Sequence, residues 1–457
     1  MAKKTNNILV PLTLVGKLYD QMIKVVTHTS TEKKNTKNII LFVGKLYPHM
    51  VEAIREYEKK NDVLFRIALI YDIKQKFSDE TRPPFDDIDI SLSCDFASDS
   101  SLQQALAPYQ DEIMSTTVRG DDMIPKLQRI IPYIPYVRTP TEQSLAWASD
   151  KILMRQHLET YNPNLSPRFL IVKKVDKRTI ETIENTLIFP VMVKPAGLGA
   201  SRLVGMCYHK EELESFLKRV FREIDSVYAE TNGNWEPKVL VEEFMDGQMY
   251  SIDAFVSQFG KVSFCPLVSV KTGKTIGFDD FFGYIQMTPT NLNPDSIQAA
   301  EDVAEQAIRA LGLRSTTAHI ELFRTEQGWK IIEVGARVGG FRHMLYEFSF
   351  SMNHTMNDVL VRAGKKVDIK KKIQGYSAAM KFFAKTEGRL IKLGGIKKIQ
   401  ELTSLKKLYI NKKVGDTCKF AKHGGSSVFN LILFNKDRSE LLADIRRVEQ
   451  TVDIRVE

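Results

Sequence analysis

Two glutamates, Glu321 and Glu333, interrupt two apolar stretches that the sequence predicts to be neighbouring strands. In 318-AHIELF-323 and 331-IIEV-334, strand alternation places each glutamate on the face opposite its apolar neighbours. A carboxylate in such a stretch is costly to bury unless it is paired or bound to a metal. Two carboxylates on adjacent strands can converge on Mg²⁺, which takes oxygen ligands and retains phosphate oxygens. The alternative is two solvated glutamates on an exposed sheet face, and these residues alone leave both readings open.

Positively charged residues and glycines accompany these carboxylates. Arg337 follows Glu333 by four residues and precedes a Gly-Gly pair. Its guanidinium could hold a phosphate or acyl-phosphate oxygen, and the alternative is a surface arginine before a turn. Lys194 ends an apolar strand before 196-AGLGAS-201, a loop whose backbone N–H groups could cover phosphate oxygens. The alternative is an ordinary β-hairpin, since neither a Walker A sequence nor GxGxxG occurs.

A third segment, 241-VEEFMDG-247, places two acids beside Phe244 and Met245. Its backbone groups and apolar side chains would suit an adenine ring. Taken by itself, the segment is explained more simply as a strand that ends in an Asp-Gly turn.

The elements that must position these residues follow from the hydrophobic pattern. Strand, helix and strand at 38–44, 48–61 and 63–72 indicate a βαβ unit and a parallel sheet near the N-terminus. Residues 8–16 are a further candidate strand. The other expected strands are 88–96, 169–174, 188–195, 203–208, 238–244, 249–258, 260–270, 317–325, 328–337, 376–384, 405–411 and 426–435, and the other expected helices are 101–113, 122–131, 143–161, 176–184, 297–312 and 437–452.

In their order along the chain, the motifs resemble those of the ATP-grasp superfamily. That family carries a lysine on an early helix, a lysine on a strand before a glycine-rich hairpin, an acid-rich adenine hinge, and two metal-binding acids ending near an arginine. The matching segments are 149-SDK-151, 190-PVMVKPAGLGASRLVG-205, 241-VEEFMDG-247, 319-HIELF-323 and 333-EVGARVGG-340. The resemblance spans about residues 135–365.

The resemblance implies an α/β (α+β) chain of three parts. An N-terminal Rossmann-like α/β domain would occupy 1–135. The ATP-grasp domain would occupy 136–365, with its two lobes divided near 235. A β-rich α+β domain would close the chain at 366–457, because 380–395 and 424–456 resemble the closing domain of L-amino-acid ligases and biotin-carboxylase-like relatives.

The resemblance also implies a role for each matching residue. Lys151 and Lys194 would contact ATP phosphates, and Lys194 would act in catalysis with Arg337, which would stabilise the transferring phosphoryl group or the tetrahedral intermediate. Glu321 and Glu333 would ligate Mg²⁺, with Mn²⁺ as an alternative ion. The other residues implied to bind ATP lie in the hairpin that would close over the phosphates and in the segment that would hold adenine; they are Gly197, Gly199, Ala200, Ser201, Glu242, Glu243, Phe244 and Met245.

Two positions depart from the family pattern. Family members often carry Glu-x-Asn at the second metal acid, and here Gly335 stands at the asparagine position. The ribose-binding acid expected seven residues after Glu242 is Met249, and Asp253 on the same strand is a substitute to consider. These two departures affect the predicted metal-binding and ribose-binding residues more than they affect the resemblance to the family.

The function implied is that of a carboxylate–amine ligase. A small-molecule carboxylate would attack the γ-phosphate of Mg-ATP, and an amine would then attack the acyl phosphate, with an amino acid as one substrate. The pocket walls are expected in 270–284 and 341–354, whose gripping residues would be among Lys271, Asp279, Asp280, Arg342 and His343. The alternatives are a bicarbonate-using enzyme like biotin carboxylase and a catalytically silent ATP-binding regulatory protein, which Gly335 and Met249 favour slightly.

Bulk composition narrows the partners and the compartment. The net charge is +9, but lysines and arginines are spread among acids, so a solvated surface explains it before nucleic acid does. Neither zinc-finger spacing nor an RRM-like signature occurs, which argues against nucleic acid. Four scattered cysteines fit a reducing cytoplasm, and no apolar stretch approaches the ~20 residues that span a membrane. A cytoplasmic protein is therefore expected, and a homodimer is common among such relatives.

Overall fold

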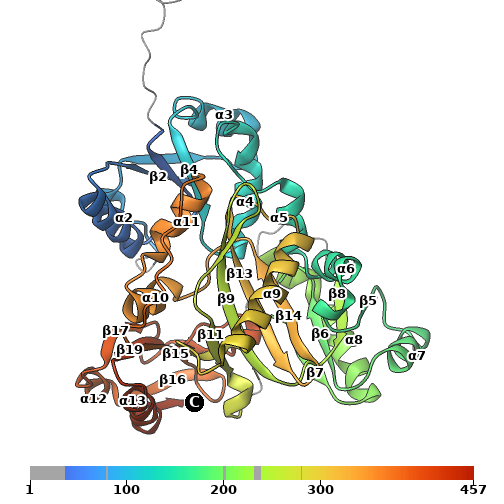
Figure 1. Cartoon of the computed structure of the whole chain (residues 1–457). Helices are drawn as coiled ribbons and strands as arrows, with labels where there is room; N and C mark the ends of the chain where they lie inside the picture. Colours follow the sequence, from blue (N-terminus) through green and yellow to red (C-terminus); the bar gives the residue numbers. More distant parts are fainter. Residues whose placement is uncertain (1–36, 79–80, 199–201, 231–237, 279) are drawn as a thin grey trace, which may run out of the picture.

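The computed structural model describes residues 37–78, 81–198, 202–230, 238–278 and 280–457 (Figure 1). The candidate strand at 8–16 lies outside the described residues. A parallel sheet followed by antiparallel sheets, with helices packed against them, confirms the predicted α/β (α+β) class.

The N-terminal part is a four-stranded parallel sheet in the order β3-β2-β1-β4. Its central strand β1 is buried at every position, as expected for a parallel strand that is covered on both faces. The predicted helix at 101–113 is too long, because the helix ends at Leu106 and β4 begins at Ile113. The elements are β1 (Ile39–Val43), α2 (Pro48–Asn61), β2 (Arg66–Asp72), β3 (Ile90–Cys94), α3 (Asp99–Leu106), β4 (Ile113–Val118) and α4 (Ile124–Ile130).

Strand β4 was not predicted because its interior reads Ser-Thr-Thr, which resembles a polar loop. All three of these residues are buried. Threonine is β-branched and suits a strand, so tertiary burial rather than hydrophobicity defines this element. The carboxyl end of β4 leads directly into Arg119, Gly120 and Asp121.

The predicted helix at 143–161 is two helices, α5 (Glu142–Ser149) and α6 (Lys151–Tyr161). Asp150 separates them in an extended conformation, and its side chain accepts hydrogen bonds from the backbone N–H groups of Ile152 and Leu153. Such a cap satisfies donors that the first turn of a helix cannot satisfy itself. The break places Lys151 on the first turn of α6.

A small antiparallel sheet in the order β5-β8-β6-β7 follows α6. Ile180 and Ile183 of one helix and Leu213 and Leu217 of another pack with Val193 in its hydrophobic core. The elements are β5 (Phe169–Val172), α7 (Lys177–Thr186), β6 (Val191–Pro195), β7 (Gly205–Cys207), α8 (Lys210–Glu230) and β8 (Val239–Glu243).

The largest element is a nine-stranded sheet in the order β14-β13-β9-β11-β12-β15-β19-β17, with β10 paired to β9. The predicted strand at 260–270 is divided into two strands around Pro266, which lacks a backbone donor. The strands of the nine-stranded sheet are β9 (Gln248–Val256), β10 (Val262–Phe264), β11 (Val268–Thr272), β12 (Gly283–Thr288), β13 (Thr316–Thr325), β14 (Gly328–Gly335), β15 (Tyr376–Phe382), β17 (Leu405–Ile410) and β19 (Phe429–Asn435).

This sheet runs without interruption past the boundary predicted at residue 365, because β12 pairs with β15. Helix α9 (Pro294–Ala310) packs against β13 and β14 at the other end (Figure 1). The C-terminal part adds α12 (Ile396–Gln400), α13 (Arg438–Thr451) and a three-stranded sheet of β16 (Gly388–Gly394), β18 (Thr417–Cys418) and β20 (Asp453–Val456).

Helices α10 (Arg342–Phe350) and α11 (His354–Arg362) were not predicted. Every residue of α11 is buried, including His354, Asn357, Asp358 and Arg362, which are polar residues that sequence analysis expects at the surface. Figure 1 shows α11 beside β4, and its Asp358 accepts hydrogen bonds from Thr117 of β4 and Thr317 of β13. Helix α11 thus joins the N-terminal sheet to the large sheet.

Among the helices that the structure describes, none combines the length and the apolar character needed to cross a membrane.

Replacing Asp150 with alanine removes the cap of α6 and should lower the free energy of unfolding by about 0.5–2 kcal/mol. Urea denaturation followed by circular dichroism measures this change. Asp225→Ala, at an exposed position within α8, is the matched control and should change stability by less than about 0.5 kcal/mol. Equal losses in the two variants would contradict the capping role.

Candidate active site

Glu321 on β13 and Glu333 on β14 lie directly opposite each other in the antiparallel register, and a β-bulge follows Glu321. Each side chain is 31% exposed, and both line a cleft between the small and the large sheets. The two predicted metal ligands are therefore brought together in a cavity wall rather than on an open face. Among the described residues, no group of three or more His, Cys, Asp and Glu is arranged to hold a metal ion. A cation here would take its further oxygens from a ligand or water.

Glu321 is the end of a buried chain of hydrogen-bonding groups. Its Oε1 lies 3.5 Å from His319 Nε2, and His319 Nδ1 lies 2.7 Å from Asp253 Oδ1. Burial lowers the pKa of His319, but the Asp253 carboxylate and Glu321 raise it more, so the net shift is upward. Burial raises the pKa of Glu321, while His319 and Arg337 lower it more, so the net shift is downward. Glu321 is held as a carboxylate.

The suggestion that Asp253 replaces the ribose-binding acid is wrong. Its side chain is fully buried and accepts a 2.9 Å hydrogen bond from the backbone N–H of Gly339, in addition to its contact with His319. His354 Nε2 lies 2.9 Å from its second oxygen. Because both oxygens are engaged inside the protein, Asp253 orients His319 and the Gly-Gly turn instead of meeting a ligand. Met249 does line the cleft, as the sequence match predicts for this position.

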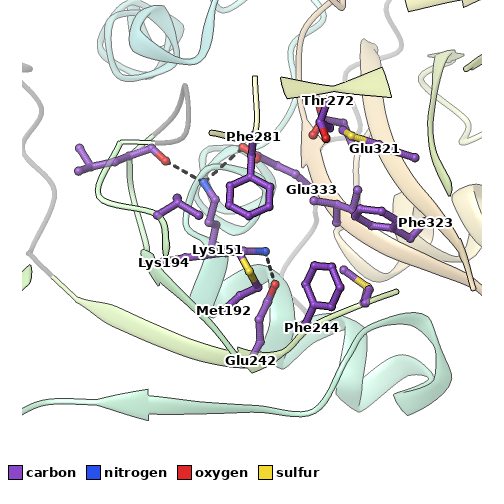
Figure 2. A pocket seen from close by; sticks show the side chains of 15 residues that line it. Lys151, Met192, Lys194, Glu242, Phe244, Thr272, Phe281, Glu321, Phe323 and Glu333 are labelled. Carbon is purple, nitrogen blue, oxygen red and sulfur yellow. Dashed lines mark hydrogen bonds and ion pairs between the residues drawn. The ribbon is translucent and has the colours of Figure 1, made fainter. Parts of the chain in front are cut away.

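Lys194, at the end of β6, forms an ion pair with Glu242 of β8 (Figure 2). Glu242 is fully buried and also accepts a 2.9 Å hydrogen bond from Arg155 Nε. Burial raises the pKa of Glu242, but Arg155 and Lys194 outweigh it and hold this pKa at about 2. Burial is also the main reason that the pKa of Lys194 is lowered, although Glu242 opposes the shift. Lys194 is thus positioned by a carboxylate inside the cleft.

The side chains of Glu242 and Glu243 are both engaged within the protein, while the role implied for these residues, which is to hold adenine through backbone groups and packing, stays a prediction. Glu242 lies inside the small sheet, opposite Phe169 on one side and Met192 on the other, so its backbone belongs to the sheet. The Glu243 side chain pairs with Arg168 and accepts a hydrogen bond from the backbone of Ile188. Neither acid therefore presents a free side chain to an adenine ring.

Arg155 is a site residue that sequence reasoning missed. It lies four residues after Lys151, and this spacing places both on the same face of α6. A search for charged residues at helical spacing around Lys151 would have found it. Its Nη2 also donates a 2.8 Å hydrogen bond to the carbonyl of Ile332, so Arg155 ties the small sheet to β14.

Lys151 links the two halves of the cleft. Its Nζ donates a 2.9 Å hydrogen bond to the carbonyl of Leu198 and lies 3.4 Å from Glu333 Oε1 (Figure 2). Because α6 begins at Lys151, directly after its cap Asp150, the Lys151 side chain lies between Leu198 and Glu333, one of the two carboxylates predicted to bind the metal. Three other residues predicted to bind ATP lie outside the described residues; they are Gly199, Ala200 and Ser201.

An apolar slot runs beside these charges. Phe244 and Met245 line it as predicted, and the space inside the cleft is about 790 Å³, including open solvent. An apolar slot that is also lined by two lysines and by the two carboxylates fits a purine nucleotide bound with a divalent cation. The other apolar residues lining the slot are Met192, Leu198, Val204, Met249, Phe281, Phe323 and Ile332.

Arg337 is held by Asp121, a residue of the N-terminal part that the sequence analysis did not single out. Its Nε lies 2.9 Å from Asp121 Oδ1 and its Nη2 lies 2.6 Å from Oδ2. Burial lowers the pKa of Arg337, but Asp121 and the two glutamates raise it more. Asp121 follows the carboxyl end of β4, where parallel sheets commonly place ligand-binding residues, but this signal was not available from the sequence because β4 itself was not predicted.

The same pair explains why glycine occupies position 335. A Cβ atom at Gly335 would lie 3.1 Å from Asp121 Oδ1 and 3.5 Å from the Arg337 guanidinium carbon. A longer side chain such as asparagine would crowd the Asp121–Arg337 ion pair. The absence of the asparagine that the family often carries at position 335 is therefore linked to the presence of Asp121, because glycine leaves room for the Asp121–Arg337 ion pair.

Of the residues considered for gripping a substrate, Arg342 lines the cavity that continues past Glu321 towards the C-terminal part. Asp280 is buried and accepts a hydrogen bond from the backbone N–H of Lys422. His343 stacks on His49 with ring centroids 3.9 Å apart, and Lys271 is exposed. Asp279 lies outside the described residues.

Comparison with known proteins agrees with this fold. Residues 187–344 match the family described as ATP-grasp domain. The chain therefore contains an ATP-grasp domain, as the resemblance predicted.

Two solved structures resemble nearly the whole chain. An L-amino acid ligase from Bacillus licheniformis has a TM-score of 0.75 at 15% identity, covering 92% of this chain and 99% of that one. An N5-carboxyaminoimidazole ribonucleotide synthetase from Thermotoga maritima has a TM-score of 0.63 at 15% identity, covering 92% and 100%. At these identities the likeness establishes the fold alone.

Among curated proteins, a D-alanine–D-alanine ligase from Lacticaseibacillus casei is 32% identical over 152 residues, which is 32% of this chain and 37% of that ligase. An uncharacterized protein from Sinorhizobium fredii is 25% identical over 242 residues, covering 50% and 46%. The matches span less than half the length of these curated relatives.

Replacing Glu242 with glutamine should leave Arg155 and Lys194 buried without a counter-charge and lower the free energy of unfolding at pH 7 by about 3–5 kcal/mol. The folded-state pKa of about 2 lies below the usual 4.5, so this stabilisation is present above pH 4.5 and is lost as pH falls towards 2. Urea unfolding at pH 7 and pH 3 should therefore show a smaller difference between variant and wild type at pH 3.

The control for that experiment is Glu243→Gln. Glu243 is the next residue of β8, and it pairs with the exposed Arg168 at the protein surface. Its loss should cost less than about 1 kcal/mol. Equal effects of the two substitutions at pH 7 would contradict the buried ion-pair account.

Proposed function

We propose that this protein is an ATP-dependent carboxylate–amine ligase that forms an amide bond and releases ADP and phosphate. One observation carries the proposal. Glu321 and Glu333 face each other in a single cleft that Lys151, Lys194 and Arg337 also line. This arrangement has the charges that a phosphoryl transfer needs, because catalysis of that step depends mainly on positioning and charge neutralisation.

The residues of this chain divide the work of binding Mg-ATP. Phe244 and Met245 would hold the adenine by packing, while Lys151 and Lys194 would contact the phosphates. Glu321 and Glu333 would hold Mg²⁺, or Mn²⁺ in its place. The bound cation would neutralise negative charge on the phosphate oxygens.

The reaction would proceed in two steps. The oxygen of a substrate carboxylate attacks the γ-phosphorus of ATP, the bond between the β- and γ-phosphates breaks, and ADP and an acyl phosphate form. The nitrogen of an amine then attacks the acyl carbon, the amide bond forms, and phosphate leaves. Arg337 would stabilise the transferring phosphoryl group, and its ion pair with Asp121 would keep its guanidinium in place.

The activities of the relatives support an amino acid as one substrate. An L-amino acid ligase and a D-alanine–D-alanine ligase are among the proteins that this chain resembles. Structures of a Staphylococcus aureus synthetase with ADP and of a biotin carboxylase domain dimer with MgADP support the choice of nucleotide and metal. The dimeric state of the latter is the support for proposing a homodimer here.

A bicarbonate-using enzyme is the second candidate function. The observation that favours it is the fold likeness to a biotin carboxylase from Campylobacter jejuni, with a TM-score of 0.61 over 91% of this chain. In that case bicarbonate would take the place of the organic carboxylate.

The proposal is tested by measuring ADP release from Mg-ATP with amino acids supplied singly and in pairs, and with bicarbonate. Particular amino-acid pairs should stimulate release, and Glu333→Gln should reduce the stimulated rate roughly 100-fold or more because it removes a metal-type carboxylate. The exposed Glu326→Gln, in the turn between β13 and β14, is the matched control and should leave the rate unchanged.

The outcomes separate the candidates. Stimulation by bicarbonate alone would favour the carboxylase. If ATP binds but neither amino acids nor bicarbonate stimulate turnover, the ligase proposal is abandoned in favour of a silent nucleotide-binding protein.

A further inference from the structure

The floor of the cavity beyond Glu321 is one face of the nine-stranded sheet. Side chains directly opposite each other on neighbouring strands point to the same face, as do residues two apart on one strand. The register therefore carries a single row of side chains across the sheet, and all of them line the cavity. Lys381 belongs to this row because it lies two residues after Ala379, which is paired with Gln286. The row is Glu333, Glu321, Ser251, Met249, Val270, Gln286 and Lys381.

Lys381 lies at the far end of this row, on β15 of the C-terminal part. Its Nζ lies 5.4 Å from the centroid of the Phe341 ring. Phe341 has a φ of 59°, a left-handed conformation that is costly for a bulky residue and that tends to occur at functional sites. The ring thus holds the ammonium group over the cavity, where Asn411, Ser427 and Asn430 are neighbouring polar residues.

The two arginines and the lysine that line the cavity differ in the contacts that their side chains make. Arg337 is paired with Asp121, and Arg342 donates hydrogen bonds to Gln286 Oε1 at 2.7 Å and to Ser251. The ammonium group of Lys381 forms no hydrogen bond or ion pair with any residue that the structure describes. Burial lowers its pKa first and the nearby Arg342 adds to this, while Glu321 opposes the shift. A half-buried ammonium without a partner is costly, and an anion would relieve that cost.

We propose that Lys381 forms a subsite for a substrate carboxylate that does not take part in the reaction. The inference rests on the proposed function and names its substrate class: one of the two substrates carries a second carboxylate besides the one that is activated. This carboxylate is either the α-carboxylate of an amino acid that supplies the amine or the second carboxylate of a dicarboxylic acid that supplies the acyl group.

The place of Lys381 in the row separates this subsite from the reacting carboxylate. Four strand intervals lie between β13 and β15 in the order β13-β9-β11-β12-β15, although the side chains reach over the cavity and both Glu321 and Arg337 act on the pKa of Lys381. The reacting carboxylate lies at the Glu333 end of the row, beside the two glutamates and Arg337, and Lys381 bounds the other end. Lys381 consequently selects a second group on the substrate.

The experiment compares Lys381→Met and Lys381→Arg with the wild type, using two probes. Every assay contains the twenty standard L-amino acids, which supply the carboxylate to be activated. The two probes, each added in excess, are the same pool and the matched pool of α-carboxamides. Two readouts are taken in the presence of Mg²⁺: ADP release with ATP, and the melting temperature with a non-hydrolysable ATP analogue. Lys397→Met, at an exposed position of α12, is the matched control.

The wild type should prefer acids over amides by about tenfold or more in kcat/KM, because a charge-assisted hydrogen bond is lost in the amide. Lys381→Met should bring this ratio close to one, while Lys381→Arg and Lys397→Met should retain most of it. If the carboxylate belongs to a dicarboxylic acyl donor, the preference should instead separate aspartate and glutamate from asparagine and glutamine.

The melting temperature distinguishes failure of this inference from failure of the proposed function. An acid-dependent rise that disappears in Lys381→Met supports the subsite even when no ADP is released. If the wild type shows no difference between the acid and amide forms in either readout, or if Lys381→Met retains the wild-type difference, the subsite is overturned.

Discussion

The hydrogen-bond register between β13 and β14 is the constraint on which the rest of the site depends. It sets Glu321 opposite Glu333, and both carboxylates then share one wall of the cleft. A shift by one residue would turn one of them to the other face of the sheet, because strand side chains alternate. The buried side chains of Ile320, Leu322 and Val334 secure the register, since the same shift would move them out of the core.

Two carboxylates so close together repel each other, and the surrounding structure compensates for this repulsion. Lys151 lies against Glu333, and His319, which contacts Asp253 through its other ring nitrogen, lies against Glu321. Lys194 is balanced separately by Glu242. Lys151, Lys194, Glu321 and Glu333 thus each have a defined partner, which fixes the position of each charged group before a ligand arrives.

The three parts of the chain meet at this site. The N-terminal sheet supplies Asp121 to hold Arg337, and the C-terminal part supplies Lys381 through a sheet that continues from the ATP-grasp domain. Helix α11 makes the first of these connections rigid, because Asp358 is hydrogen-bonded to strands of both sheets. The N-terminal and C-terminal parts are therefore constituents of the site as well as flanking units.

The sequence by itself determined the class of fold and singled out Glu321 and Glu333 as candidate metal ligands, because strand alternation and the order of motifs can be read from residues that are neighbours in the chain. The roles of Asp121 and Arg155 could not be assigned in this way, since each meets its partners only across long distances in the chain. Lys381 could not be assigned either, because only the pairing of strands across the large sheet brings it to the cavity. The same limit applies to α11 and β4, whose polar residues are buried by packing that the local sequence does not show. Only the tertiary structure decided that Asp253 faces His319 and not a ribose, because both of its carboxylate oxygens are engaged by groups far apart in the sequence.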